Sequence, residues 1–117
     1  MTTILRTATL LALGLAATAQ AGISTGNAAA GKAKATTVCA ACHGADGNKT
    51  LDNTYPRLAG QYPDYLAKAL HDYKSGKRKN PIMGGQAQGL SDTEIADLAA
   101  YFGSLPAQIH DLSGHQR

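Results

Sequence analysis

The sequence has little of the material from which small cores and disulfide frameworks are usually built. Its 117 residues include no tryptophan, one phenylalanine and five tyrosines, whereas glycine occurs thirteen times. So few large apolar side chains are unusual in a chain of this length, which is close to the size at which a single hydrophobic core is only marginally stable. The chain holds two cysteines, which exclude a multiply bridged scaffold, and two methionines including the initiator. Such a chain needs another source of hydrophobic bulk.

An excess of charge of one sign is also lacking. Eleven Lys and Arg residues stand against eight Asp and Glu residues, which gives a formal net charge of +3. No arginine-rich patch with interleaved aromatic residues occurs, so we expect no nucleic-acid binding. One local cluster of positive side chains is either a solvated loop or a docking patch. Its members are Lys74, Lys77, Arg78 and Lys79.

The longest apolar run lies near the N-terminus and is too short for a membrane span. It extends from Ala8 to Ala17, follows Arg6 and precedes the small-residue triplet Ala-Gln-Ala at 19–21. These features are the n-region, h-region and cleavage site of a secretory signal peptide. We therefore expect a cleavable signal peptide over 1–21 and a flexible lead-in over 22–26, with no stable membrane insertion after cleavage. An uncleaved N-terminal anchor is the alternative.

The most informative motif is Cys39-Ala40-Ala41-Cys42-His43. Two thiols and an imidazole at this spacing form the attachment site for a c-type haem. Each thiol can add to one vinyl group of the porphyrin as a thioether, which leaves His43 beneath the iron as an axial ligand. We expect one haem c per chain, bound covalently through Cys39 and Cys42, and a porphyrin would supply the missing hydrophobic bulk.

Two cysteines with this spacing also occur in zinc sites and in thiol-disulfide redox sites. A tetrahedral zinc site would need a fourth ligand from His71, His110 or His115, and none of these has a familiar finger spacing. A thiol-disulfide site would follow a strand in an α/β pattern, and no period-two alternation persists in the chain. Haem attachment is therefore the favoured interpretation.

Helical periodicity, with no persistent period-two alternation, predicts an all-α domain. We expect a first helix over 28–37, capped by Asn27, and a second over 62–73 that carries a stripe of tyrosines and ends at Gly76. We interpret that stripe as core. Ser91 and Glu94 form a capping box for a final helix that ends near Gly103. Gly31, inside the first helix, suggests a close helix crossing.

Met83 is the one methionine besides the initiator, and it lies in the glycine- and proline-rich segment 76–89, which we expect to be a loop. A thioether there could bind the iron opposite His43, and His/Met ligation raises the reduction potential and leaves no free coordination position. A gap-filling core methionine is the alternative reading of Met83. His71 is the rival ligand, although a surface position suits it better.

These motifs together resemble class I cytochrome c, and the resemblance implies a small all-α fold of about four helices with irregular loops wrapped around one covalent haem. The segments Tyr55 to Gln61 and Lys74 to Arg78 are similar to those of short bacterial periplasmic monohaem cytochromes and of each half of the dihaem ones. The resemblance covers 27–105, taken as the cytochrome c domain, and leaves 106–117 as a polar tail. It implies Met83 as second axial ligand, a Pro56 carbonyl that accepts a hydrogen bond from the ligand histidine, and an Arg57 contact with a haem propionate.

The expected function is therefore a soluble, monomeric, periplasmic electron carrier rather than an enzyme. Its iron would cycle between ferric and ferrous states, with redox proteins such as a dehydrogenase, an oxidase or a cytochrome complex as partners. The alternative is a haem-bearing subunit or dedicated partner of a respiratory dehydrogenase or oxidase. A haem peroxidase or a gas sensor would require Met83 to leave the iron.

Overall fold

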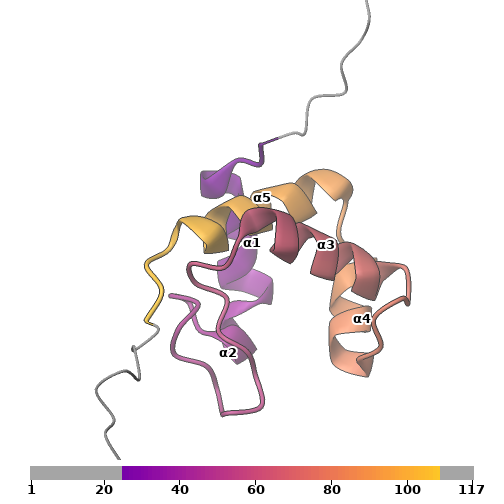
Figure 1. Ribbon diagram of the computed structural model, residues 1–117, viewed down its shortest axis with the longest axis horizontal. Helices are drawn as coiled ribbons and strands as arrows, with labels where there is room; N and C mark the ends of the chain where they lie inside the picture. The colour runs from indigo at the N-terminus through magenta and orange to yellow at the C-terminus, as the bar shows by residue number, and fades with distance from the viewer. Residues whose placement is uncertain (1–24, 109–117) are drawn as a thin grey trace, which may run out of the picture.

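Five α-helices and their connecting loops form the part of the chain that the structure describes, arranged as in Figure 1. The computed structural model describes residues 25–108, and the signal peptide predicted over 1–21 lies outside them. No strand occurs within the described residues, which confirms the all-α prediction, and none of their helices is long and apolar enough to cross a membrane. The helices are α1 (Ala28–Val38), α2 (Ala40–His43), α3 (Pro63–Lys74), α4 (Pro81–Gln88) and α5 (Asp92–Ser104).

Helix α1 crosses α5 at a glycine, as the sequence predicts. The Asn27 side chain caps α1 by accepting hydrogen bonds from the first-turn N–H groups, and the Asn27 backbone N–H donates to the Asp97 carboxylate at 2.6 Å. A Cβ atom on Gly31 would lie 2.0 Å from the carbonyl oxygen of Asp97, so only glycine permits this approach. The crossing fixes the course of α1, which ends immediately before Cys39.

Helix α5 supplies most of the hydrophobic core. It begins with the predicted capping box, in which the Ser91 side chain accepts from the Glu94 N–H and the Glu94 side chain accepts from the Ser91 N–H. Lys34 of α1 lies 2.7 Å from the Glu94 carboxylate, and this contact is the largest cause of the lowered pKa of Glu94. The buried side chains of α5 are Ile95, Leu98, Ala99, Tyr101 and Phe102.

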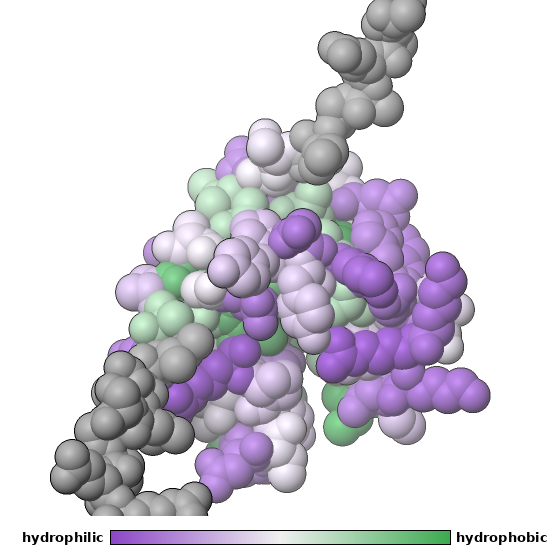
Figure 2. All heavy atoms as spheres, viewed as in Figure 1, coloured by the Kyte–Doolittle hydropathy of each residue, from purple (hydrophilic) through white to green (hydrophobic). Residues whose placement is uncertain are grey.

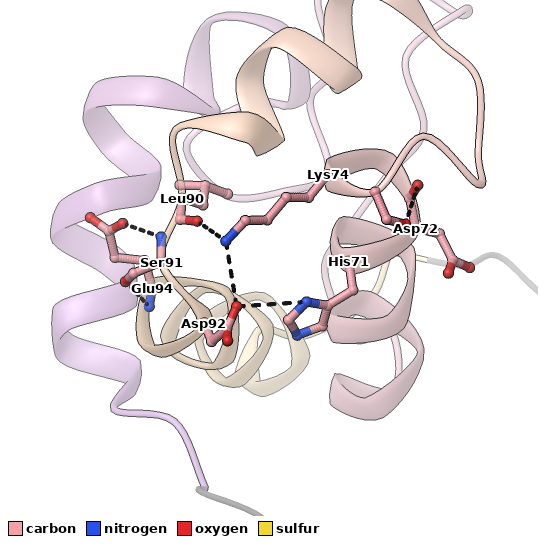
Figure 3. Close-up of polar contacts among 8 residues, drawn as sticks. His71, Asp72, Lys74, Leu90, Ser91, Asp92 and Glu94 are labelled. Carbon is pink, nitrogen blue, oxygen red and sulfur yellow. Dashed lines mark hydrogen bonds and ion pairs between the residues drawn. The ribbon is translucent and has the colours of Figure 1, made fainter.

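A cluster of polar contacts joins the end of α3 to the start of α5 (Figure 3). The Lys74 ammonium donates to the Leu90 carbonyl at 2.6 Å and to the Asp92 carboxylate at 3.4 Å. His71 Nδ1 lies 3.9 Å from the same carboxylate oxygen. Lys74 is therefore bonded within the fold. These contacts join α3 to α5, the two helices that precede and follow α4 in the chain.

The sequence predicts a loop over 76–89, and this prediction is wrong because residues Pro81–Gln88 form α4. The Asn80 side chain caps the helix by accepting from the N–H groups of Ile82 and Met83, each at 3.0 Å. Pro81 occupies the first turn, where its missing N–H breaks no helical hydrogen bond. Met83 therefore lies on a helix with a defined start and not in a loop.

The connection between α2 and α3, residues 44–62, is irregular but anchored. The Gly47 carbonyl accepts two backbone hydrogen bonds from residues 58–59. Asn48 is 6% exposed; its side chain donates to the Pro106 carbonyl and accepts from the Gln108 N–H, both at 3.0 Å. The start of the predicted polar tail, 106–108, is thus bonded to this loop.

Candidate functional site

One cavity of about 620 Å³ collects the residues that the sequence singles out. This volume lies within the usual range for cofactor pockets. In the space-filling view a notch separates the lobe of α2 and the 44–62 loop from the lobe of α3 and α4 (Figure 2). Cys39, Cys42, His43, Pro56, Arg57 and Met83 all line the cavity. Its apolar wall includes Val38, Leu58, Leu66, Leu70, Ile82, Leu90, Leu98 and Phe102.

The two cysteines lie at the junction of α1 and α2. Cys39 is the C-cap residue of α1 and the N-cap residue of α2. Helix α2 is a single turn, and its Cys42 and His43 also line the cavity. Burial raises the pKa of the Cys39 thiol to about 11, although Lys34 opposes the shift. Thiol-disulfide chemistry requires a lowered thiol pKa, so this environment does not favour the redox-thiol alternative.

His43 is held in one orientation by the 44–62 loop. The residue is 6% exposed, and its Nδ1 lies 2.8 Å from the Pro56 carbonyl oxygen. A carbonyl oxygen can only accept, so Nδ1 carries the proton and Nε2 keeps the lone pair that binds a metal. Tyr55 packs edge-on against the imidazole, with ring centroids 6.1 Å apart. The carbonyl contact therefore fixes the tautomer that an axial ligand needs.

Met83 reaches the cavity from α4, whereas His43 reaches it from α2, and the two helices lie on different sides of the molecule in Figure 1. Met83 is half-buried, and its backbone N–H is bonded to the Asn80 cap. His71, the rival ligand, does not line the cavity and is exposed beside Asp92. His110 and His115 lie outside the described residues.

Arg57 is exposed and lines the cavity from the 44–62 loop. Its Nη1 donates to the Gln108 carbonyl at 2.9 Å, a contact with the start of the tail that the sequence does not predict. The guanidinium has further N–H groups available for an anion.

Sequence reasoning missed several cavity residues on and after α3. The tyrosine stripe is not core: Tyr62 and Tyr65 are exposed, and Leu66 is the buried side chain of α3. Tyr65 and Tyr73 instead line the cavity, together with Arg78. A stripe of tyrosines without tryptophan or phenylalanine could have signalled an amphipathic wall, because a tyrosine body packs while its hydroxyl stays accessible.

The residues present fit a covalently bound haem better than an isolated metal ion. Two adjacent thiols, an imidazole with a free Nε2 and a thioether border one largely apolar space, and this donor set suits haem iron. No group of three or more His, Cys, Asp or Glu side chains that could hold a metal ion occurs in residues 25–108. The described part of the chain thus offers no tetrahedral zinc site.

Comparison with known protein families agrees with this donor set. The family model described as "Cytochrome c" matches residues 28–106. Cytochrome c4 of Pseudomonas aeruginosa is 55% identical over 95 residues, which cover 81% of this chain and 45% of the relative. Cytochrome c-554(548) of Halomonas halodenitrificans is 49% identical over 82 residues, which cover 68% of this chain and 96% of the relative. The chain spans about half the length of the cytochrome c4 relative.

A more distant relative and a solved structure extend the comparison. The cytochrome subunit of sulfide dehydrogenase from Chlorobaculum tepidum is 42% identical over 72 residues, which cover 62% of this chain and 64% of the relative. The crystal structure of reduced recombinant cytochrome c4 from Pseudomonas stutzeri superposes on this chain with a TM-score of 0.64 at 42% sequence identity. The matched region covers 69% of this chain and 46% of the cytochrome c4 chain. The fold and the sequence thus point to the same group of proteins.

Proposed function

Since the chain belongs to the cytochrome c family, we propose that it is a periplasmic electron carrier with one haem c, ligated by His43 and Met83. The observation that carries the proposal is that the Cys39 to His43 turn and Met83 border the same cavity from separate helices. Haem binding and electron transfer are what the family and its cytochrome c4 relatives support. The single haem, the axial pair and the compartment are the finer parts of the proposal.

Each site residue has a defined task in this proposal. Cys39 and Cys42 would hold the haem through thioether bonds, in which each thiol is added across a vinyl group and no oxidant is consumed. His43 would offer Nε2 to the iron while Pro56 holds its Nδ1 proton. Met83 would hold the iron from α4 and leave no open position for small molecules. When bound, the haem supplies the one-electron change between ferric and ferrous iron.

The surroundings of the site suit electron exchange more than catalysis on a substrate. The cavity-lining residues include no Asp, Glu or Lys, and their one histidine, His43, is the proposed iron ligand. The described cavity wall therefore holds no carboxylate, lysine or second histidine to act as general acid or base beside an open iron position, and its remaining proton-transfer groups are tyrosines. This arrangement supports a carrier rather than a peroxidase.

The alternative is a haem subunit of a dehydrogenase, and the Chlorobaculum tepidum relative named as such a subunit favours it. The two roles differ in how the protein is found in the cell. In size-exclusion chromatography of a gently prepared periplasmic extract, a free carrier would elute as a single small species. A subunit would elute together with its enzyme.

The first test of the proposed function is covalent attachment. After expression with the haem-attachment machinery, the denatured chain should keep its haem stain, and the Cys39→Ser/Cys42→Ser double variant should lose it. Intact mass should equal one haem plus a chain that starts at Gly22, and the protein should fractionate with the periplasm. A colourless wild-type band would remove the basis of the proposal.

The axial pair is tested by ligand exclusion. We expect ferrous wild-type protein to bind carbon monoxide poorly and Met83→Ala to bind it readily. Gln88→Ala, which changes an exposed side chain of the same helix that does not line the cavity, serves as the control and should behave as wild type. Rapid binding by the wild type would contradict Met83 ligation and favour a gas-sensing or enzymatic role.

A further inference from the structure

The described residues that line the cavity carry charge of one sign. Arg57 and Arg78 are their permanently charged side chains, and none of them is a carboxylate. The acidic group whose charge acts on Arg78 is Asp72, which does not line the cavity. The remaining wall is apolar apart from uncharged polar groups. Both arginines are exposed, so the cavity suits an apolar body whose anionic groups lie at an exposed edge, where a guanidinium can pair with them.

Arg78 is held at this cavity by two tyrosines that also line it. Its guanidinium carbon lies 4.9 Å from the centroid of the Tyr73 ring, a cation–π arrangement. Its Nη1 donates to the Tyr65 hydroxyl at 3.4 Å. The Arg78 backbone N–H donates to the Asp72 carbonyl at 2.9 Å, which fixes the chain just after α3. The guanidinium is thus oriented by the cavity wall and keeps N–H groups free for an anion.

The neighbouring positive side chains are placed differently. Arg78 is exposed, as Lys77 and Lys79 are, but neither lysine lines the cavity. Lys74 is bonded to Leu90 and Asp92 (Figure 3). Arg57 lines the cavity, but its guanidinium donates to the Gln108 carbonyl in the tail. In the described part of the chain, Arg78 is therefore the cation that side chains of the cavity wall hold in place.

We propose that Arg78, oriented by Tyr65 and Tyr73, binds a carboxylate of the group that fills the cavity. This inference rests on the proposed function, under which that carboxylate is a haem propionate. A guanidinium matches a carboxylate in a bidentate pair and favours its ionised form. The same cation disfavours the ferric state, which carries one more positive charge than the ferrous state, and so raises the midpoint potential.

The test compares variants of the holoprotein by redox titration at several pH values. Arg78→Gln should lower the midpoint potential by several times the shift that Lys77→Gln causes. Lys77→Gln removes the same charge from a neighbour that is also exposed but does not line the cavity, so it is the matched control. Arg78→Lys keeps the charge and should restore most of the potential, and it serves as the fallback variant if the glutamine variant folds poorly.

The pH dependence identifies the group that Arg78 contacts. Wild type should show a nearly constant potential between about pH 5 and 8, whereas Arg78→Gln should show a potential that falls as the freed carboxylate ionises in this range. Phenols titrate at about pH 10, the cysteines are tied up as thioethers and His43 is bound to iron, so none of these should add a slope here. The titratable or charged residues that line the cavity are Cys39, Cys42, His43, Tyr55, Arg57, Tyr65, Tyr73 and Arg78. Asp72 also acts on Arg78 through its charge; the Lys68 hydrogen bond is the largest cause of the lowered pKa of Asp72, so this carboxylate stays ionised above about pH 5 in the variant as well.

Two results would overturn the inference while leaving the proposed function intact. In the first, Arg78→Gln and Lys77→Gln shift the potential equally, and Arg78 is then an ordinary surface charge. In the second, Arg57→Gln gives the large shift and the new pH slope, which assigns the carboxylate to Arg57 instead. In both cases the haem stain and carbon monoxide exclusion of the wild type would persist.

Discussion

The α1–α5 crossing depends on a single missing methyl group at Gly31. Glycine inside a helix costs about 1 kcal/mol relative to alanine, so its presence in α1 opposes helix formation. In return, glycine lets the α1 and α5 backbones approach closely. A Cβ atom at residue 31 would lie only 2.9 Å from the Tyr101 Cβ. The two backbones would have to separate to admit any side chain, and that separation would displace the residues leading to Cys39.

We predict that Gly31→Ala destabilises the holoprotein by about 2 kcal/mol, because overpacking outweighs the gain in helix propensity. The measurement is guanidinium unfolding followed by far-UV circular dichroism. Gly85→Ala is the matched control: Gly85 is exposed in α4, and its Cβ would meet no atom within 4 Å. That variant should be neutral or more stable by up to about 1 kcal/mol. A Gly31→Ala protein at least as stable as wild type would show that the crossing adapts freely.

Single residues differ in how well the sequence reveals them. The contiguous motif at 39–43 indicates haem attachment directly, because its spacing alone places the two thiols and the imidazole close together. The contacts of Pro56 and Arg78 depend on where the chain folds back, so no local pattern encodes them. A family resemblance implies the first of these contacts, and the structure has it. The packing of Arg78 on Tyr73 requires the turn after α3, which becomes visible only in three dimensions.

Among the elements, helices with strong end signals were predictable and α4 was not. Asn27 and the Ser91–Glu94 box cap α1 and α5, and both helices end within one or two residues of the predicted positions. The sequence of α4 contains a proline and two adjacent glycines, a composition typical of loops. The eight-residue helix is too short and has too little apolar periodicity to predict a helix instead. The available signal was Asn80 followed by Pro81, an N-cap and first-turn pair.

Because α4 carries Met83, its cap should affect the iron site. We predict that Asn80→Ala costs about 1 kcal/mol of α4 stability and raises the rate at which imidazole or cyanide binds ferric protein several-fold. The cap bonds the N–H of Met83 itself, so its loss lets the first turn open and the thioether leave.

The control for this prediction is Asn27→Ala, which removes a comparable cap from α1, away from the cavity. It should reduce stability to a similar extent and leave the rate of ligand binding near that of wild type. Equal rates in the two variants would mean that opening of the site reflects global stability and not the start of α4.

Across the whole molecule, the polypeptide core is small and the cavity is large. In the described residues, Ile95 is the one large side chain with under 2% exposure, and several core members are alanines. Helices α3, α4 and α5 and the 44–62 loop all contribute side chains to the cavity wall. Elements that meet mainly around a cavity lose much of their mutual contact when nothing fills it.

We therefore predict that the haem-free chain is largely unfolded. The Cys39→Ser/Cys42→Ser variant, freed of haem, should show a small fraction of the holoprotein's helical circular dichroism and no cooperative thermal transition. A matched control is wild-type holoprotein treated identically, which should keep its helicity. The α1–α5 pair is the segment with the best chance of residual structure, because its crossing needs no cavity contact at Gly31. Native-like helicity with a sharp transition in the haem-free chain would mean that the α5 core alone folds the domain, and that the cavity is preformed rather than organised by its ligand.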